Sequence, residues 1–358
     1  MISLGRSEAV SCSNPALWFI AQREGKLEDL QGLSFEIFDV STEAKRLTPA
    51  VVQGSTTVDV STDCPVGGRV STGRYVASWT VPADEPTGRH EIRWSYSWDG
   101  VTTIVARIEF EVLETAGLPI GPRYALVSDM LEEGVPATIS VARIQTAIVL
   151  ASRLIDAFTG RFFEPRFGVR EYDGQDARAL LFEDPVIAIS SLVLDGASVE
   201  LSGIKVYGRH LSGMTGTDDR ESPKIVFDDD AFRGSYTYGN EYLRTSKFSR
   251  GTQNVVVSGV WGYTEDVHNG APWGDTPLLI RHAAKLLALR EIPTLRPTPT
   301  DSSCREDLAI RTRIIEEKTR DQSYKLDTPR KFGAQFTGDP EIDIILTMFT
   351  RPPAVGGA

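Results

Sequence analysis

The side chains that could carry acid–base or metal chemistry are few and widely separated in this sequence. Its four histidines stand singly, at His90, His210, His268 and His282. The chain has no zinc-protease motif, no phosphate-binding glycine loop and no nucleophile elbow. His282 falls in an apolar run, where a packed or hydrogen-bonded histidine is more common than a general base. We therefore expect no catalytic residue, no bound cofactor and no enzymatic activity.

Two acidic clusters are the remaining candidates for a metal site. Asp218-Asp219 and Asp228-Asp229-Asp230 offer carboxylate oxygens, which hard cations prefer as ligands. Neither cluster has the ligand spacing of a calcium-binding loop, and solvated carboxylates in turns are the simpler interpretation. The sequence therefore predicts no metal.

One basic group could bind a phosphate or an acidic partner. Arg161, Arg166 and Arg170 follow one another closely, with Phe162, Phe163 and Phe167 between them. The alternative is an exposed polar face with the aromatic side chains packed inward, and this second interpretation is favoured.

The three cysteines, Cys12, Cys64 and Cys304, form no C-x-x-C pair, so buried free thiols are expected. Cys12 and Cys64 could form a disulfide if strands bring them together.

Length and charge narrow the class of protein. A chain of 358 residues suggests about two domains, and 41% hydrophobic with 24% charged residues is ordinary for a folded protein. The net charge of -11 argues against a protein that grips nucleic acid, although an acidic wall would let a DNA duplex slide past without sequence-specific binding. No run of 18 apolar residues and no export signal is present, so we expect no membrane contact and synthesis without export.

The first part of the chain, residues 1–113, predicts a β-sandwich. Its order from Gly73-x-Tyr75 through Trp79 and Thr87-Gly88 to the Trp94/Trp98 run resembles that of immunoglobulin-like domains. Apolar and polar residues alternate at period two in several short runs, such as those of residues 33–37, 75–81, 92–98 and 104–112. Asp99-Gly100 indicates a two-residue hairpin turn between the last two runs. Residues 114–123, which are rich in Gly and Pro, are expected to be a linker.

Residues 124–320 change to a helical periodicity at Ser140. One long amphipathic helix is predicted from there to Gly160, and its apolar stripe comprises Ile144, Ile148, Ala151, Ile155 and Phe158. Val149, Leu150 and Leu154 add a second apolar flank, so the helix packs either against another subunit or wholly inside its own domain. A small antiparallel β-element follows, and a helix capped by Thr276 comes next. Another helix is predicted from a capping box at Ser303.

The C-terminus carries a short amphipathic segment on a tether. Residues 321–338 are mostly polar or Gly, and residues 339–353 then form a helix that Asp339-Pro340 caps. One face of this helix carries Ile342, Ile345, Leu346 and Phe349. A helix this short is marginal alone, so it docks either on a partner groove or on its own domain.

The order of several motifs in the second part resembles the head-tail connector, or adaptor, proteins of long-tailed bacteriophages. SRLIDAFTGRFFEP (152–165) is followed by YDG (172–174) and by LLFEDPVIAISSLVLDG (180–196). VVVSGVWGYT (255–264), TPLLIRHAAKLLALRE (276–291) and GDPEIDIILTMFTRPP (338–353) come after them in the order typical of that family. The resemblance covers roughly residues 124–353, and the N-terminal β-domain is additional to the usual connector.

This resemblance implies an α+β protein with a helical connector core that assembles into a homo-oligomeric ring, commonly of twelve copies. Such a ring sits in the virion neck, is assembled in the host cytoplasm, binds beneath the portal protein, and receives a stopper or tail-completion protein while DNA passes through. Ile342, Ile345, Leu346 and Phe349 would then contact the portal, and the stripe from Ile144 to Phe158 would pack the ring. A peripheral neck, collar or tail protein whose sandwich binds fibres or the host surface is the alternative. A hydrolase with a carbohydrate-binding sandwich is a weaker one.

Overall fold

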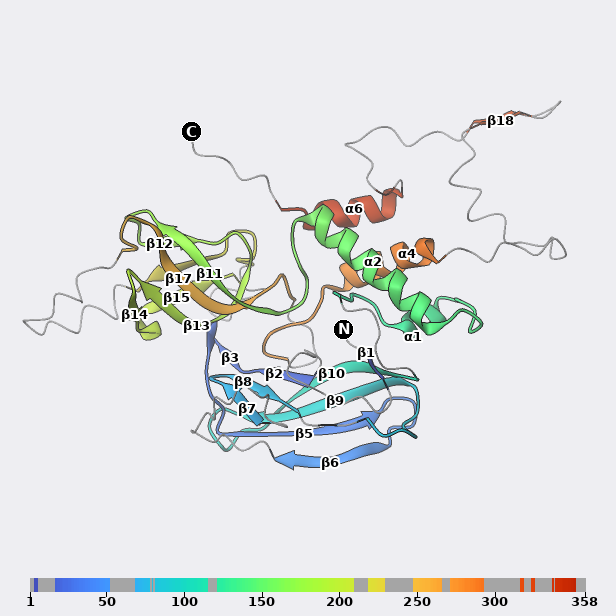
Figure 1. Ribbon diagram of the computed structural model, residues 1–358, viewed down its shortest axis with the longest axis horizontal. Helices are drawn as coiled ribbons and strands as arrows, with labels where there is room; N and C mark the ends of the chain where they lie inside the picture. Colours follow the sequence, from blue (N-terminus) through green and yellow to red (C-terminus); the bar gives the residue numbers. More distant parts are fainter. Residues whose placement is uncertain are drawn as a thin grey trace, which may run out of the picture. The chain divides into compact units, whose positions relative to one another are not determined.

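The protein has a mixed α+β fold with several mainly antiparallel sheets, which confirms the expected fold class at this level (Figure 1). The computed structural model describes residues 3–5, 17–51, 68–77, 79, 81–114, 121–208, 218–228, 247–265, 271–292, 316–318, 323–325, 337 and 339–351. The chain forms two compact units. Residues 1–118 and 161–277 make the first, here called the β unit, and residues 119–160 and 278–358 make the second, the helical unit.

Two sheets of the β unit come from the first part of the chain. The larger has the order β1-β10-β9-β5-β6, and its strands are β1 (Ser3–Gly5), β5 (Gly32–Asp39), β6 (Lys45–Val51), β9 (Gly88–Ser97) and β10 (Ile104–Leu113). The smaller has the order β2-β8-β7, with β2 (Trp18–Ile20), β7 (Gly68–Ser71) and β8 (Arg74–Val76). All pairs are antiparallel except β1 with β10.

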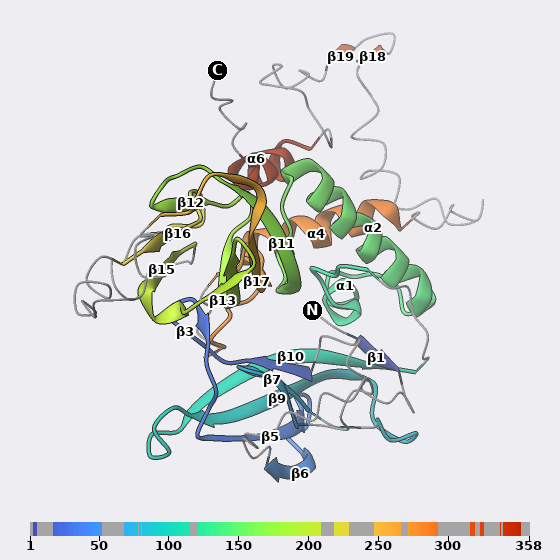
Figure 2. The same cartoon turned by 60° about the vertical axis from the view of Figure 1, so that its left-hand side comes forward.

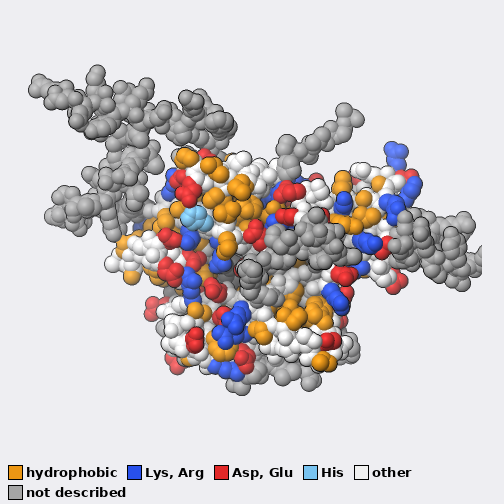
Figure 3. Space-filling view, turned by 180° about the vertical axis from the view of Figure 1, so that it is seen from behind, with side chains coloured by type: hydrophobic (Ala, Val, Ile, Leu, Met, Phe, Trp, Pro, Cys, Tyr) orange, Lys and Arg blue, Asp and Glu red, His pale blue; other side chains and the backbone are white. Residues whose placement is uncertain are grey.

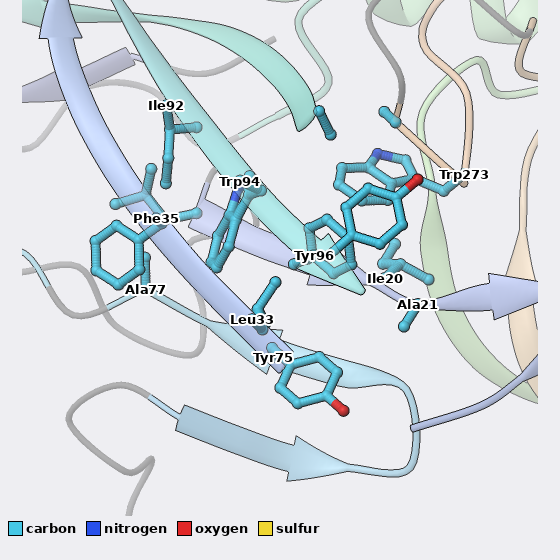
Figure 4. Close-up of a cluster of buried hydrophobic side chains, with 14 of the residues drawn as sticks. Ile20, Ala21, Leu33, Phe35, Tyr75, Ala77, Ile92, Trp94, Tyr96 and Trp273 are labelled. Atoms are coloured by element: carbon cyan, nitrogen blue, oxygen red, sulfur yellow. The ribbon is translucent and has the colours of Figure 1, made fainter. Parts of the chain in front are cut away.

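The inward faces of these strands supply the core that the period-two pattern predicts. In β5 and β9 every second side chain is buried, and Figure 4 shows Phe35, Ile92 and Trp94 grouped with Tyr75 of β8. Aromatic contacts cross the two sheets, because the ring of Phe19 in β2 lies 5.3 Å from Trp94 and 5.0 Å from Tyr96.

The hairpin between β9 and β10 forms as predicted, but its turn is wider than the two residues expected. The last register pair is Tyr96 with Ile104, and the turn is closed by the carboxylate of Asp99. This carboxylate accepts hydrogen bonds from the backbone N–H groups of Val101 and Thr102, at 2.9 and 2.7 Å, and from the hydroxyls of Ser97 and Thr102. A side chain that satisfies backbone donors in this way supports a longer loop, which the Asp-Gly pair alone does not reveal.

We expect the Asp99→Ala variant to lose stability and, with it, part of the protein's acid sensitivity. The hydrogen bonds from Thr102 and Val101 hold the pKa of Asp99 well below the ordinary value of an aspartate. A carboxylate with a depressed folded-state pKa stabilises the fold above its unfolded-state pKa, and this contribution is lost as the pH falls through the folded-state value. Urea unfolding of the natural protein and of Asp99→Ala, at pH 7 and below pH 3, measures this contribution. The difference in unfolding free energy between the two proteins should be smaller at the lower pH.

Two further sheets belong to the β unit. The largest is a sheet of order β11-β17-β13-β4-β3, with β14 also paired to β13. Its strands are β3 (Gln22–Arg23), β4 (Lys26–Leu27), β11 (Arg166–Gly174), β13 (Val186–Leu194), β14 (Ala197–Val199) and β17 (Gly251–Trp261). A second sheet has the order β12-β16-β15, from β12 (Ala179–Leu181), β15 (Ile204–Tyr207) and β16 (Lys224–Phe227), with a 3-10 turn at Leu201–Gly203 before β15.

The N-terminal segment takes part in this second group of strands. β4 pairs in parallel with β13 through Lys26 and Ile189, and the backbone N–H of Ile189 donates to the carbonyl of Gly25 at 2.8 Å. The domain boundaries expected from the sequence, 1–113 and 124–320, follow the order of the chain and stay a prediction. The contacts group residues 161–277 with the N-terminal sheets. The sequence did not predict this grouping, because strand pairing over more than 160 residues leaves no periodic signal.

One hydrophobic core joins the two groups of strands inside the β unit. Ile187, Ala188, Val260, Ala271 and Trp273 are buried in the same cluster as the N-terminal core residues. Trp273 lies 5.1 Å from Phe19 in an edge-to-face arrangement, and Figure 4 shows it beside Tyr96. The N-terminal sheets therefore bury apolar side chains of residues 161–277 that would otherwise be exposed.

The helical unit contains α1 (Val127–Glu132), α2 (Val141–Thr159), α4 (Leu278–Glu291) and α6 (Pro340–Phe349). Figures 1 and 2 both show α4 and α6 beside α2, and the three helices contact one another. A short ladder of β18 (Glu316–Lys318) with β19 (Ser323–Lys325) occurs in the chain between α4 and α6.

The ends of these helices follow their local sequence. α2 begins after Ser140 and ends at Gly160, whose φ of 66° is the left-handed conformation predicted there. α6 begins after Asp339, whose side chain accepts from the N–H of Glu341 at 3.0 Å. The hydroxyl of Thr276, the residue expected to cap α4, donates to the carbonyl of Phe163, and α4 begins two residues later at Leu278. The three cysteines and most of the helix predicted after Ser303 lie outside the described residues. Where that helix was expected to continue, Glu316–Lys318 forms the strand β18 instead.

Candidate interaction surface

The predicted ring-packing stripe of α2 lies inside the helical unit. Ile144, Ile148, Ala151 and Ile155 are buried, and Phe158 is half-buried. α2 contacts both α4 and α6, so this stripe contributes to the core of its own unit. That is the second of the two arrangements the sequence left open for this helix. A role for these five residues in ring packing stays a prediction. In the structure α4 and α6 cover the stripe.

The predicted docking face of α6 is also covered. Ile342 and Leu346 are fully buried, and Ile345 and Phe349 are nearly so. Because α6 contacts α2 and α4, this is the fold-back arrangement, in which the helix docks on its own unit. The short helix is stabilised by this packing, as the weakness of an isolated ten-residue helix requires.

Polar contacts hold α6 at both of its ends. Glu341 lies 3.1 Å from the imidazole of His282, and Asp339 accepts from Arg290 at 3.1 Å, so two residues of α4 bind the start of α6. At its end, the backbone N–H of Arg351 donates to the carbonyl of Thr159 at 2.9 Å. These surface pairs are each worth about 0.2–1 kcal/mol, so the buried apolar face is the larger stabilising contribution.

Each of α2, α4 and α6 also carries apolar residues that lie outside this core. On α6, Ile344 and Met348 are 63% and 64% exposed, although the opposite face of the same helix is buried. The corresponding exposed residues on the other two helices are Leu150, Leu154, Leu278 and Leu279. In the space-filling view, hydrophobic side chains gather over the helices of this unit (Figure 3). We call these six side chains the outer apolar set.

Sequence reasoning found only part of the outer apolar set. Leu150 and Leu154 were recognised as a second flank of α2, but Ile344, Met348, Leu278 and Leu279 were missed. For Ile344 and Met348 a signal was available, because α6 carries apolar residues on two of its sides. A helix with such a pattern is expected to be covered on more than one face. The outer apolar set is therefore the candidate contact surface of this unit.

A buried amide stands out among the side chains of α2. Gln145 is only 1% exposed, and neither its Oε1 nor its Nε2 has a hydrogen-bond partner in the described part of the chain. Leaving such a group unsatisfied costs about 1–3 kcal/mol. The amide therefore lowers the stability of the helical unit.

We expect Gln145→Met, which keeps the length of the side chain and removes the amide, to raise the free energy of unfolding by about 1–3 kcal/mol. Urea denaturation measures the change. Thr146→Met, at the neighbouring exposed position, is the matched control and should stay within about 0.5 kcal/mol of the natural protein. A loss of stability in Gln145→Met would show that the amide has a partner in solution.

The basic group that could bind an anion is occupied by carboxylates of the chain itself. Arg161 is buried and forms a two-pronged ion pair with Glu221, at 2.9 and 2.6 Å, which lowers the pKa of that carboxyl. Arg166 pairs with Glu164, and Arg170 pairs with Asp184. Phe163 is buried while Phe162 and Phe167 are half-buried. The packing of Phe163 agrees with the favoured interpretation, but Arg161 is buried and does not lie on an exposed face.

Tyr263 completes the arrangement around Arg161. Its ring lies beneath two guanidinium groups, those of Arg161 at 4.7 Å and Arg220 at 4.1 Å, and its hydroxyl donates to Glu221 at 3.1 Å. Burial raises the pKa of Tyr263 to about 12. The cluster is a satisfied structural network that fixes the 218–221 segment against the end of β17.

The other candidate chemical groups are also paired within the chain. Asp218 binds Arg220, and Asp228 binds Lys205, while Asp229 and Asp230 lie outside the described residues. His90 is buried between Glu85 and the carbonyl of Gly88, and His210 and His268 are not described. Within the described ranges no group of three His, Cys, Asp or Glu side chains is placed to hold a metal ion.

None of the described helices is long and apolar enough to cross a membrane. No protein-family model matches the chain, and no curated protein matches it.

Proposed function

We propose that the chain is a structural virion protein rather than an enzyme, and that it forms a homo-oligomeric ring in the neck of a long-tailed bacteriophage. The ring would join the portal protein to the stopper or tail-completion protein and extend the channel through which DNA passes. The N-terminal sheets would be the immunoglobulin-like sandwich that the sequence predicts, and the helical unit together with residues 161–277 would be the connector part. The proposed place in the neck rests on the order of the motifs in residues 124–353.

The observation that carries the self-assembly part is the outer apolar set of the helical unit. Its six side chains, on α2, α4 and α6, are at least 37% exposed although the inner faces of the same helices are fully packed. Each fully buried side chain of this size contributes roughly 1.5–3 kcal/mol, so burial of the set between copies would stabilise an oligomer substantially. The net charge of -11 fits a channel past which DNA slides.

We expect the double variant Leu150→Glu/Leu154→Glu to fold normally and to lose self-association, because both leucines are exposed and charges on them oppose burial against another copy. Native mass spectrometry measures the oligomeric state, and circular dichroism checks the fold. Arg153→Glu, at the exposed position between the two leucines, is the control for an added acidic charge. An unchanged oligomer in the double variant would exclude this face as the contact.

The place in the neck is tested separately, by imaging particles that carry the protein. A closed ring of copies on the portal is expected. Sparse copies at the periphery of the neck would contradict the ring and support the alternative, a collar or tail protein that binds fibres or the host surface.

One observation favours that alternative as a second candidate function. The end of the β9–β10 hairpin is apolar and exposed: Val101 is 86% exposed, and Ile104 and Val105 are 38% and 44% exposed. An apolar hairpin end suits contact with another protein. Val101→Asp should leave the ring intact and weaken attachment of a peripheral partner if the sandwich has this second role.

A further inference from the structure

The connection between α4 and α6 is far longer than their packing requires. Arg290, at the end of α4, and Asp339, just before α6, form a hydrogen bond of 3.1 Å although they lie 49 positions apart in the sequence. Antiparallel neighbouring helices are commonly joined by two to eight residues. A chain of that length is therefore not needed to let α6 reach the groove on its own helical unit.

A long connection changes which groove α6 can reach. The closure entropy of a loop rises with its length, so the effective concentration of α6 at its own groove falls as the connection grows. At an upper limit of about 3.5 Å per residue, this connection could span well over 100 Å. In an assembly, the groove of a neighbouring copy would therefore lie within reach.

The contacts that hold α6 are the same whichever copy supplies the helix. The four buried side chains, Ile342, Ile345, Leu346 and Phe349, pack on α2 and α4, and the polar contacts to His282, Arg290 and Thr159 come from those same two helices. No contact of α6 would have to be redesigned for an exchange. Exchange of an identical element between copies has a low energetic cost for this reason.

We infer that α6 is an exchangeable arm: in the assembled state, the α6 helix of one copy occupies the α2–α4 groove of a second copy of this chain. The inference rests on the self-assembly part of the proposed function, and it adds which element links the copies. With this exchange the α2–α4 groove of each copy is filled by the α6 helix of a neighbouring copy. Each exchanged helix then adds four buried apolar side chains to the contact between the two copies.

The exchange can be tested by cross-linking across the α4–α6 contact. Cys12, Cys64 and Cys304 are replaced by Ser, and His282→Cys and Glu341→Cys are introduced into the full chain together, because their natural side chains meet at 3.1 Å. The assembled protein is treated with a short bismaleimide and separated under denaturing conditions. Covalent ladders of two and more chains are expected. Each single-cysteine variant is the control and should give no ladder.

A shortened connection gives the second arm of the test. Deletion of residues 297–331 leaves eleven residues between the two helices, 293–296 and 332–338. This connection still lets α6 close on its own groove, because Arg290 and Asp339 lie within hydrogen-bond distance. The shortened chain should fold, cross-link only within single chains and lose the oligomers that depend on exchange.

The outcomes separate the exchange from the proposed function. A stable oligomer in native mass spectrometry whose cross-links stay within single chains overturns the exchange and leaves the ring standing. A chain that stays a monomer at all concentrations overturns both. Ladders that persist at full strength in the shortened chain also overturn the exchange, because its α6 closes within the same copy.

Discussion

Replacing Trp273 by alanine is expected to lower the free energy of unfolding of the whole β unit by about 3–5 kcal/mol, although this residue lies far along the chain from the N-terminal sheets. Its indole is buried in the core that both groups of strands share and contacts the ring of Phe19 at 5.1 Å. Removal leaves a cavity lined by side chains of both groups. The two groups should therefore lose stability together.

Hydrogen exchange of the native protein measures this, because it reports the opening of each strand separately. Amides of β9 and of β17 should lose protection by similar amounts in Trp273→Ala. Val101→Ala, at an exposed hairpin position, should change neither. Loss of protection in β17 alone would show that the two groups of strands unfold independently.

The shared core also changes what truncation should do. If the N-terminal domain were an independent attachment, deletion of residues 1–113 would leave the rest intact. In the structure that deletion uncovers Ile187, Ala188, Val260, Ala271 and Trp273 and removes β4, which pairs with β13. Arg74 adds a further contact, since its guanidinium lies 3.5 Å over the ring of Phe167 in β11. We therefore expect the truncated chain to aggregate, which light scattering of the purified fragment would show.

Local features of this fold were predictable because short-range sequence determines them. The helix from Val141 to Thr159 has the apolar spacing of one buried face, and Gly160 ends it with a positive φ. Asp339 caps α6 for a similarly local reason. The alternating residues of β5 and β9 predicted their inward faces correctly, because a strand places every second side chain on one side.

Long-range features were not predictable from the same reasoning. The pairing of Lys26 with Ile189 depends on the whole tertiary arrangement, and no periodicity in either segment points to the other. Trp273 follows a turn-forming Ala-Pro pair and gave no core signal of its own. The choice between a partner groove and the same unit for α6 was open for the same physical reason: an apolar stripe predicts burial and does not identify what covers it.

A matched pair of substitutions on α6 should separate the inner from the outer face of this helix. Ile342 is 0% exposed and Ile344 is 63% exposed, and both are isoleucines on the same ten-residue helix. Ile342→Ala should cost about 2–5 kcal/mol, since it removes buried methylene groups and leaves a cavity against α2 and α4. Ile344→Ala should change the stability of the separate chain by less than about 0.5 kcal/mol, because its side chain is already in water.

The measurement for this pair is the protection of α6 amides from hydrogen exchange, made at a dilution where the chains are separate. A helix this short keeps its structure only through its docked face, so Ile342→Ala should release α6 while α2 and α4 keep most of their protection. Equal protection in the two variants would mean that the inner face does not hold the helix. If the outer apolar set meets another copy, as we propose, Ile344→Ala should weaken association of the concentrated protein without loosening the helix.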